Sequence, residues 1–117
     1  MQPISRDELN SMNQQQKRDF VLINVLPREQ FLKKHIRTSI NIPAGEADFA
    51  GKVEEVAGSK DRDIVVYCAS FECNASPDAG RKLEQSGFRN VFDYEGGTRD
   101  WFEPKSDGRQ TAAEPGS

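Results

Sequence analysis

The stretch IVVYCASFECNASPD, residues 64–78, decides the fold of this chain. Its first residues, Ile64 to Tyr67, are apolar and mostly β-branched, which is typical of a strand buried on both faces of a sheet. Cys68 follows directly, and after a loop of small and polar residues Ser76-Pro77-Asp78 predicts a helix with Ser76 as its N-cap. The first N–H groups of a helix lack intrahelical partners, so they stabilise a nearby thiolate. We therefore predict that Cys68 is a nucleophile with a pKa below that of an ordinary thiol.

On both sides of this stretch, strand-like runs alternate with helix-like runs. This alternation is the pattern of a parallel sheet covered by helices on both faces. The chain shows no internal repeat. Strands are expected at 20–25, 40–42, 64–67 and 91–92, and helices at 5–12, from residue 27, at 49–58 and at 76–86.

Several helix signals are explicit in the sequence. Ser5 and Glu8 have the spacing of a capping box. Pro27 predicts the start of a helix whose Phe31 and Leu32 face inward. The next helix carries one apolar stripe, and Gly58 and Gly87 are expected to end their helices in the left-handed conformation. That stripe consists of Phe49, Val53 and Val56. Near the end of the chain, the sequence predicts a turn at Gly96-Gly97 with positive φ and an apolar lid at Trp101-Phe102.

The composition of the 117 residues bounds the organisation of the chain. One domain is expected at 1–103. Residues 104–117, the tail after Glu103, are polar, contain proline and glycine, and are expected to be disordered because they cannot bury enough apolar surface.

Charge and hydropathy exclude some classes of partner. The formal net charge of −3 argues against nucleic-acid binding. No apolar run approaches the ~20 residues that span a bilayer, and the N-terminal residues do not resemble a signal peptide, so we expect no membrane partner and a cytoplasmic location. The two cysteines, Cys68 and Cys73, are too few for a disulfide framework, and in a reducing compartment both are expected to rest as thiols.

Five separated motifs occur in a familiar order. They are LINVLPREQFLKKHI (22–36), TSINIP (38–43), IVVYC (64–68), LEQSGFRNV (83–91) and YEGGTRDW (94–101). Together they resemble the rhodanese-like family of single-domain sulfurtransferases, and the resemblance covers residues 4–102. It implies an α/β, three-layer fold of about five mostly parallel strands with helices on both faces, and with Cys68 in the loop after the fourth strand.

The resemblance also implies an activity. The family moves a sulfane sulfur from thiosulfate or a persulfide donor to a thiol or cyanide acceptor, through a persulfide that would here form on Cys68. No cofactor and no metal is expected, since backbone N–H groups can hold an anionic donor. The expected partners are the small donor and the acceptor, which can be a protein thiol, and the chain is expected to be a monomer. The substrate-binding loop would comprise Ala69, Ser70, Phe71, Glu72, Cys73 and Asn74.

This loop departs from the family pattern. A common family version carries one or two arginines, whereas residues 68–75 contain no cation and include Glu72. We therefore expect weaker use of thiosulfate, and better use of a neutral or protein-bound persulfide. Phosphatases and arsenate reductases of similar fold need an arginine six residues after the cysteine, and position 74 is Asn. The first strand ends in Asn24-Val25-Leu26 instead of Asp-Val-Arg, which removes a buried ion pair.

Some assignments remain open at the level of sequence. Cys68 could be an inert buried thiol, although its position favours catalysis. Cys73 is either a small loop residue or a resolving thiol that would form a disulfide with Cys68. The alternative function is accordingly a noncatalytic binding or redox-sensing module that uses a Cys68/Cys73 disulfide. His35 is the single histidine, and its position at a helix end favours a structural role over that of a base.

Overall fold

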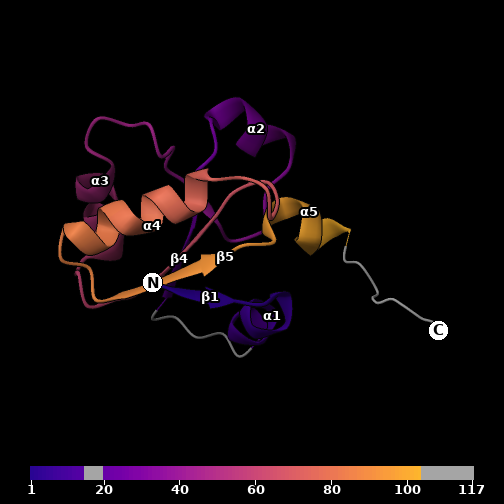
Figure 1. Ribbon diagram of the computed structural model, residues 1–117, viewed down its shortest axis with the longest axis horizontal. Helices are drawn as coiled ribbons and strands as arrows, with labels where there is room; N and C mark the ends of the chain where they lie inside the picture. Colours follow the sequence, from indigo (N-terminus) through magenta and orange to yellow (C-terminus); the bar gives the residue numbers. More distant parts are fainter. Residues whose placement is uncertain (15–19, 104–117) are drawn as a thin grey trace.

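The computed structural model describes residues 1–14 and 20–103, which form one sheet with helices on both sides (Figure 1). The predicted disordered tail at 104–117 lies outside the described residues. The strands are β1 (Gln2–Ile4), β2 (Phe20–Asn24), β3 (Ile40–Asn41), β4 (Asp63–Tyr67) and β5 (Asn90–Tyr94). The helices are α1 (Arg6–Gln14), α2 (Arg28–Lys33), α3 (Phe49–Ala57), α4 (Ala75–Gln85) and α5 (Gly97–Phe102).

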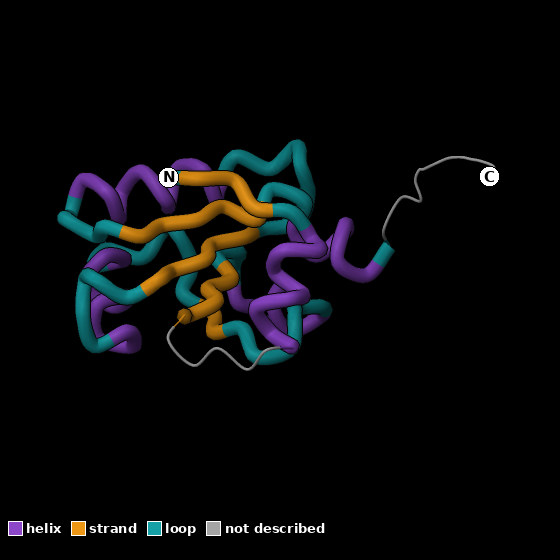
Figure 2. The backbone as a smooth tube through the Cα atoms, turned by 90° about the horizontal axis from the view of Figure 1, so that it is seen from below, coloured by secondary structure: helices purple, strands orange, loops and turns teal. Residues whose placement is uncertain are grey.

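The five strands are parallel and lie in the order β1-β5-β4-β2-β3. Figure 2 shows them side by side. The expected α/β fold is confirmed, and β4, the strand that leads into Cys68, occupies the centre of the sheet. Strand β1 is not among the sequence-based predictions, because its three residues include Pro3 and lack an apolar run. It pairs with β5 at the edge of the sheet, where a proline is tolerated.

A hydrophobic cluster covers each face of the sheet, and β4 contributes to both by alternation. Ile64 and Val66 join the cluster under α3 and α4, whereas Val65 and Tyr67 join the cluster toward α1 and α5. All four side chains are fully buried. Because both faces of β4 are buried, residues 64–67 form one continuous apolar run instead of alternating with polar residues.

Two predicted core positions are wrong. Leu32 is 63% exposed, because α2 is a short peripheral helix without a buried residue, and Ile36 after it enters the core instead. Val56 is 41% exposed, and Ala57 is buried in its place. In α3 the buried row follows positions i, i+4 and i+8, which are Phe49, Val53 and Ala57.

The predictions of helix ends from local sequence signals are more accurate than the predictions of these core positions. The capping box is confirmed: the Glu8 amide donates to Ser5 Oγ at 3.1 Å, and the Ser5 amide donates to the Glu8 carboxylate at 2.8 Å. Gly58 and Gly87 have φ values of 82° and 99°, as predicted for residues that end α3 and α4. These signals act within a few residues of each other, so they can be identified before the fold is known.

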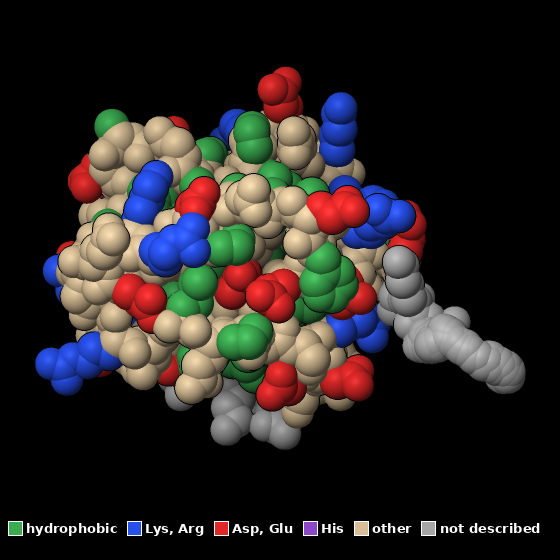
Figure 3. All heavy atoms as spheres, in the orientation of Figure 1, with side chains coloured by type: hydrophobic (Ala, Val, Ile, Leu, Met, Phe, Trp, Pro, Cys, Tyr) green, Lys and Arg blue, Asp and Glu red, His purple; other side chains and the backbone are tan. Residues whose placement is uncertain are grey.

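The surface carries acidic, basic and apolar side chains intermixed on the face shown in Figure 3. None of the helices within residues 1–14 and 20–103 has the length and apolar character needed to cross a membrane.

Candidate active site

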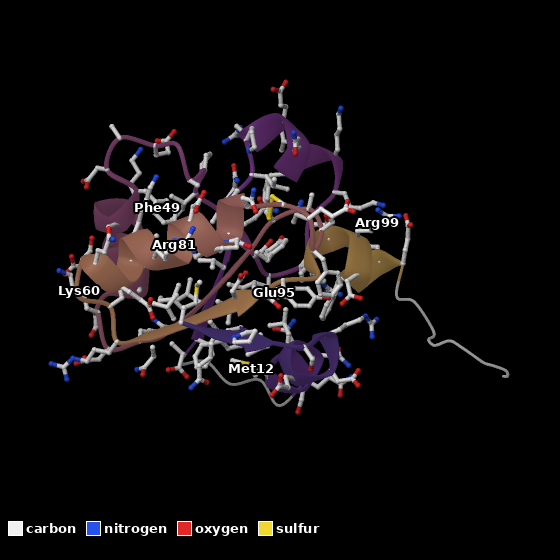
Figure 4. The ribbon with its side chains drawn as sticks, viewed as in Figure 1. Met12, Phe49, Lys60, Arg81, Glu95 and Arg99 are labelled. Carbon is white, nitrogen blue, oxygen red and sulfur yellow. A yellow bond between two sulfur atoms is a disulfide. The ribbon has the colours of Figure 1, made fainter. Side chains whose placement is uncertain are left out.

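Cys68 lies at the carboxyl end of β4, at the start of the loop that leads into α4. Its side chain is 1% exposed, and its sulfur forms a disulfide with Cys73, which Figure 4 shows as a yellow bond. The structure thus describes the oxidised form of the pair, whereas the expectation that both cysteines rest as thiols concerns a reducing compartment and stays a prediction. A turn closed by the Cys73 amide on the Ser70 carbonyl, at 3.1 Å, brings the two Cα atoms to 6.5 Å. This separation is within the range that a disulfide spans.

The predicted cradle of loop amides around the Cys68 sulfur is not formed in the oxidised state, within the part of the chain that the structure describes. Two of these amides bind Ser70 instead: that of Cys73 binds its carbonyl, and that of Glu72 binds its Oγ at 3.3 Å. The Cys68 sulfur has the Ser76 hydroxyl as its hydrogen-bond partner, at 3.6 Å. Because a disulfide sulfur has no proton, Ser76 is the donor.

The assignment of Ser76 as N-cap is wrong. Helix α4 begins at Ala75, and its N-cap position is Asn74, two residues before Ser76, with no side-chain cap among the described residues. Ser76 is therefore inside the first turn, where its side chain is 1% exposed and contacts the sulfur. Because the N-cap lies two residues earlier than predicted, Ser76 is a partner of the Cys68 sulfur instead of a capping residue.

Asp93 completes the buried polar group beside the sulfur. It lies on β5 next to Val66 of β4 and is 2% exposed, and within residues 1–14 and 20–103 its Oδ1 has no hydrogen-bond partner. Burial raises the pKa of its carboxyl, the hydrogen bond with the Ser76 side chain lowers it in part, and the negative charge of Glu95 raises it further. Sequence reasoning missed Asp93, although one signal was available: it stands two residues after buried Val91, at a position whose side chain faces the core.

The first turn of α5 holds the start of the cysteine loop. The Thr98 amide donates to the Cys68 carbonyl at 3.0 Å, and the Arg99 amide donates to the Ala69 carbonyl at 2.9 Å. The predicted positive φ is found at Gly97, at 65°, whereas Gly96 is in the helical region. A Cβ on Gly97 would lie 2.7 Å from the Ala69 carbonyl carbon. The glycine therefore permits close contact between helix and loop.

The two residues of the predicted apolar lid, Trp101 and Phe102, both belong to α5 but have different surroundings. Trp101 packs edge-on against Tyr94, with ring centroids 6.2 Å apart, and adds to the cluster on that face of the sheet. Phe102 is 45% exposed.

A pocket of about 330 Å³ opens beside the loop. Ser70, Phe71 and Glu72 line one side, and α5 lines the other with Arg99. The remaining lining residues are Gly96, Asp100 and Glu103. Phe71 is 70% exposed at this pocket. Arg99, labelled in Figure 4, brings a cation beside a loop that has none. Sequence reasoning missed it because the cation comes from a helix about 30 residues further along the chain.

Asn24 and His35 both have structural partners. Asn24, in place of the family's aspartate, is fully buried, donates to the Tyr67 hydroxyl at 3.0 Å and accepts from the Leu26 amide at 2.9 Å. The His35 ring stacks on Phe31 at a centroid distance of 3.9 Å, and its Nδ1 lies 2.7 Å from the Phe31 carbonyl oxygen.

Cys68 follows the central parallel strand and begins the loop that leads into a helix. This arrangement defines the class of protein: an α/β domain with a cysteine at the carboxyl end of its central strand. The chain belongs to the rhodanese-like domain family, whose model matches residues 5–104. The resemblance stated from the sequence motifs is thus confirmed.

Related proteins include a transcriptional regulator and a putative sulfurtransferase. The chain is 36% identical over 98 residues to the HTH-type transcriptional regulator Rv0324 of Mycobacterium tuberculosis, a match that covers 84% of this chain and 40% of the regulator. It is 31% identical over 90 residues to the putative mitochondrial thiosulfate sulfurtransferase of Schizosaccharomyces pombe, with 69% and 62% covered. The chain therefore spans less than two thirds of either relative.

Among solved structures, the human single-domain sulfurtransferase TSTD1 is similar over 91% of this chain and 99% of its own. The TM-score is 0.73 and the sequence identity 21%, so this likeness concerns the fold.

Proposed function

We propose that this domain is a sulfurtransferase that carries a sulfane sulfur as a persulfide on Cys68. The observation that carries the proposal is the position of this cysteine, at the carboxyl end of the central strand and beside a pocket lined by its own loop. Ligands of parallel α/β sheets bind at this edge. The family and the sulfurtransferase among the relatives support the same reaction class.

The reaction requires the reduced form of the protein. A dithiol reductant first opens the Cys68–Cys73 disulfide. The Cys68 thiolate then attacks the outer sulfur of the donor, and with thiosulfate the leaving group is sulfite, which keeps the electron pair of the broken S–S bond. An acceptor thiolate or cyanide next attacks the outer sulfur of the persulfide, which restores the Cys68 thiolate.

The pocket supports a donor or acceptor that is not simply a small anion. Arg99 offers one positive charge, but Glu72, Asp100 and Glu103 share the same lining. Exposed Phe71 offers an apolar contact. A persulfide or thiol with an apolar group next to the sulfur, including one on a protein, fits this lining better than thiosulfate does.

Intact-mass measurement tests the proposal. The fully reduced protein is incubated with thiosulfate or with a low-molecular-weight persulfide, and the expected result is the added mass of one sulfur atom. The adduct disappears in Cys68→Ala and persists in Cys73→Ala, the matched control in the same loop. If no donor loads the wild-type protein, or if Cys68→Ala loads equally well, the proposal is wrong.

The disulfide favours a second candidate function, a redox-gated or sulfide-releasing module. In it the Cys73 thiolate attacks Sγ of the Cys68 persulfide, hydrosulfide leaves, and the Cys68–Cys73 disulfide remains until a dithiol reduces it. This path predicts that loaded wild-type protein releases sulfide without an acceptor, whereas loaded Cys73→Ala retains its sulfur. Equal retention by both proteins would leave the transferase as the better candidate.

A further inference from the structure

The Cys68–Cys73 disulfide, the yellow bond in Figure 4, joins two residues that the fold buries unequally. We propose that a thiol reductant attacks Sγ of Cys73, which makes Cys73 a site of mixed-disulfide modification and Cys68 the thiolate that leaves. The inference deepens the proposed function and rests on it, because it describes how the sulfur carrier is released. Its test, however, needs no sulfur donor.

Cys68 is enclosed by packed groups. It is 1% exposed and belongs to the hydrophobic cluster under α3 and α4. Its carbonyl accepts from the Thr98 amide at 3.0 Å, and its sulfur lies 3.6 Å from the buried Ser76 hydroxyl. An attacking thiolate must approach the far side of the attacked sulfur, in line with the S–S bond that breaks. Attack on Cys68 would therefore require the groups packed around it to move apart first.

Cys73 lies at the edge of the same cluster, in a more open part of the loop. It is partly buried, and its neighbours in the chain, Glu72 and Asn74, are both exposed. The turn that holds it depends on local hydrogen bonds to Ser70, from the Cys73 amide at 3.1 Å and from the Glu72 amide at 3.3 Å. Such a surface turn opens at a lower free-energy cost than the end of a central strand does. Cys73 is therefore the sulfur that a reductant reaches first.

Attack at Cys73 is a single substitution. The thiolate of the reductant forms an S–S bond to Sγ of Cys73, the Cys68–Cys73 bond breaks, and its electron pair leaves with Cys68 as a thiolate. One disulfide forms as one breaks, so Cys73 is left in a mixed disulfide with the reductant. A dithiol completes the reduction when its second thiolate attacks the reductant sulfur of this mixed disulfide, and Cys73 leaves as a thiolate.

The position of Ser76 favours Cys68 as the leaving group. The Ser76 hydroxyl remains beside the released sulfur and can donate a hydrogen bond to it. A hydrogen bond to a thiolate lowers the pKa of the thiol, and a thiol of lower pKa leaves faster. The first exchange thus already frees the sulfur carrier. While the mixed disulfide lasts, Cys73 cannot expel hydrosulfide from a Cys68 persulfide, so a monothiol releases the carrier and blocks sulfide release together.

Peptide mapping after brief exposure to a neutral monothiol tests the inference. Oxidised wild-type protein is mixed with excess 2-mercaptoethanol, samples are quenched with acid at successive times, and free thiols are capped with N-ethylmaleimide under mildly acidic conditions. Trypsin releases both cysteines in one peptide, residues 63–81, and fragment masses between them show which cysteine carries which group. At the earliest times, Cys73 is expected to carry the mixed disulfide at least about tenfold more often than Cys68.

The matched control is the same oxidised protein unfolded in urea. Both sulfurs are then accessible, and the two mixed disulfides are expected in similar amounts. A preference for Cys68 in the folded protein, or no preference at zero time, would overturn the inference. The same ratio in folded and unfolded protein would also overturn it, because the preference would then come from the local sequence and not from burial.

Sulfur loading of the reduced protein is a separate measurement. A protein that is attacked at Cys73 but takes no sulfur from any donor would contradict the proposed function and leave the exchange inference in place. A protein that loads sulfur on Cys68 but is attacked at Cys68 would contradict the exchange inference alone.

Discussion

At the scale of single residues, the Tyr67 hydroxyl joins three segments of the chain. Asn24 Nδ2 donates to it at 3.0 Å, the Ile36 amide donates at 2.9 Å, and Ser39 Oγ lies at 2.8 Å. Tyr67 is fully buried, and burial raises the pKa of its phenol while these hydrogen bonds oppose the rise. One neutral hydroxyl thus fixes the end of β2 and the segment before β3 relative to the strand that carries Cys68.

Replacing Tyr67 with Phe is expected to lower the free energy of unfolding by about 1–3 kcal/mol, because the Asn24 and Ile36 donors stay buried without an acceptor. Urea unfolding followed by circular dichroism measures the change. Phe71→Ala, which alters an exposed side chain, is the control and is expected to stay within about 0.5 kcal/mol of wild type. Equal stability of Tyr67→Phe and wild type would contradict the role of the hydroxyl.

Single residues were predictable where the signal is local. The Ser5/Glu8 box, Gly58 and the position of Cys68 depend on near neighbours. Asp93 and Arg99 belong to the site through strand pairing and helix packing, which no short stretch reveals. Ser76 was noticed, but its role is different because the N-cap of α4 lies two residues earlier, at Asn74.

At the scale of elements, α5 and the cysteine loop behave as one unit. Gly97→Ala is expected to disrupt this unit, because a Cβ there meets the Cys68 carbonyl oxygen and the residue needs positive φ. The loop must move, and we expect sulfur loading of Cys68 to fall at least tenfold, which corresponds to about 1.4 kcal/mol in activation free energy.

Loading rates by intact mass measure this effect, with circular dichroism to confirm that the variant is folded. Gly45→Ala is the matched control and is expected to leave loading unchanged, since a Cβ there has no neighbour within 4 Å in the part of the chain that the structure describes. Normal loading by folded Gly97→Ala would show that the close contact is dispensable.

The elements that sequence reasoning missed share a physical property. Strand β1 and helix α5 are short, with three and six residues, and neither carries a full period of apolar residues. Their positions are fixed by partners already in place, β5 for the strand and the cysteine loop for the helix. By contrast, the bounds of the long buried strands were predicted to within one or two residues, because a run of apolar, β-branched residues by itself indicates a buried strand.

At the scale of the whole molecule, Asp93 makes stability depend on pH. Its folded-state pKa is raised above the value in the unfolded chain, about 3.9. The stabilisation of the folded state that comes from this raised pKa is therefore fully present below pH ~4 and is lost as the pH rises through the raised pKa. The free energy of unfolding of the wild-type protein, measured relative to that of Asp93→Asn, is expected to fall between pH ~4 and the raised pKa and to stay constant above it.

Urea unfolding of both proteins at a series of pH values gives this difference directly. A constant difference between wild type and Asp93→Asn across the series would mean that the buried carboxyl titrates as it does in the unfolded chain.

Because α5 amides bind the carbonyls of Cys68 and Ala69, the conformation of the cysteine loop depends on a helix that lies outside the sheet. A chain that stops after Tyr94 would contain all five strands, yet it would lack the α5 amides that bind the cysteine loop and the Trp101 ring that packs on Tyr94. Expression fragments should therefore extend past Phe102.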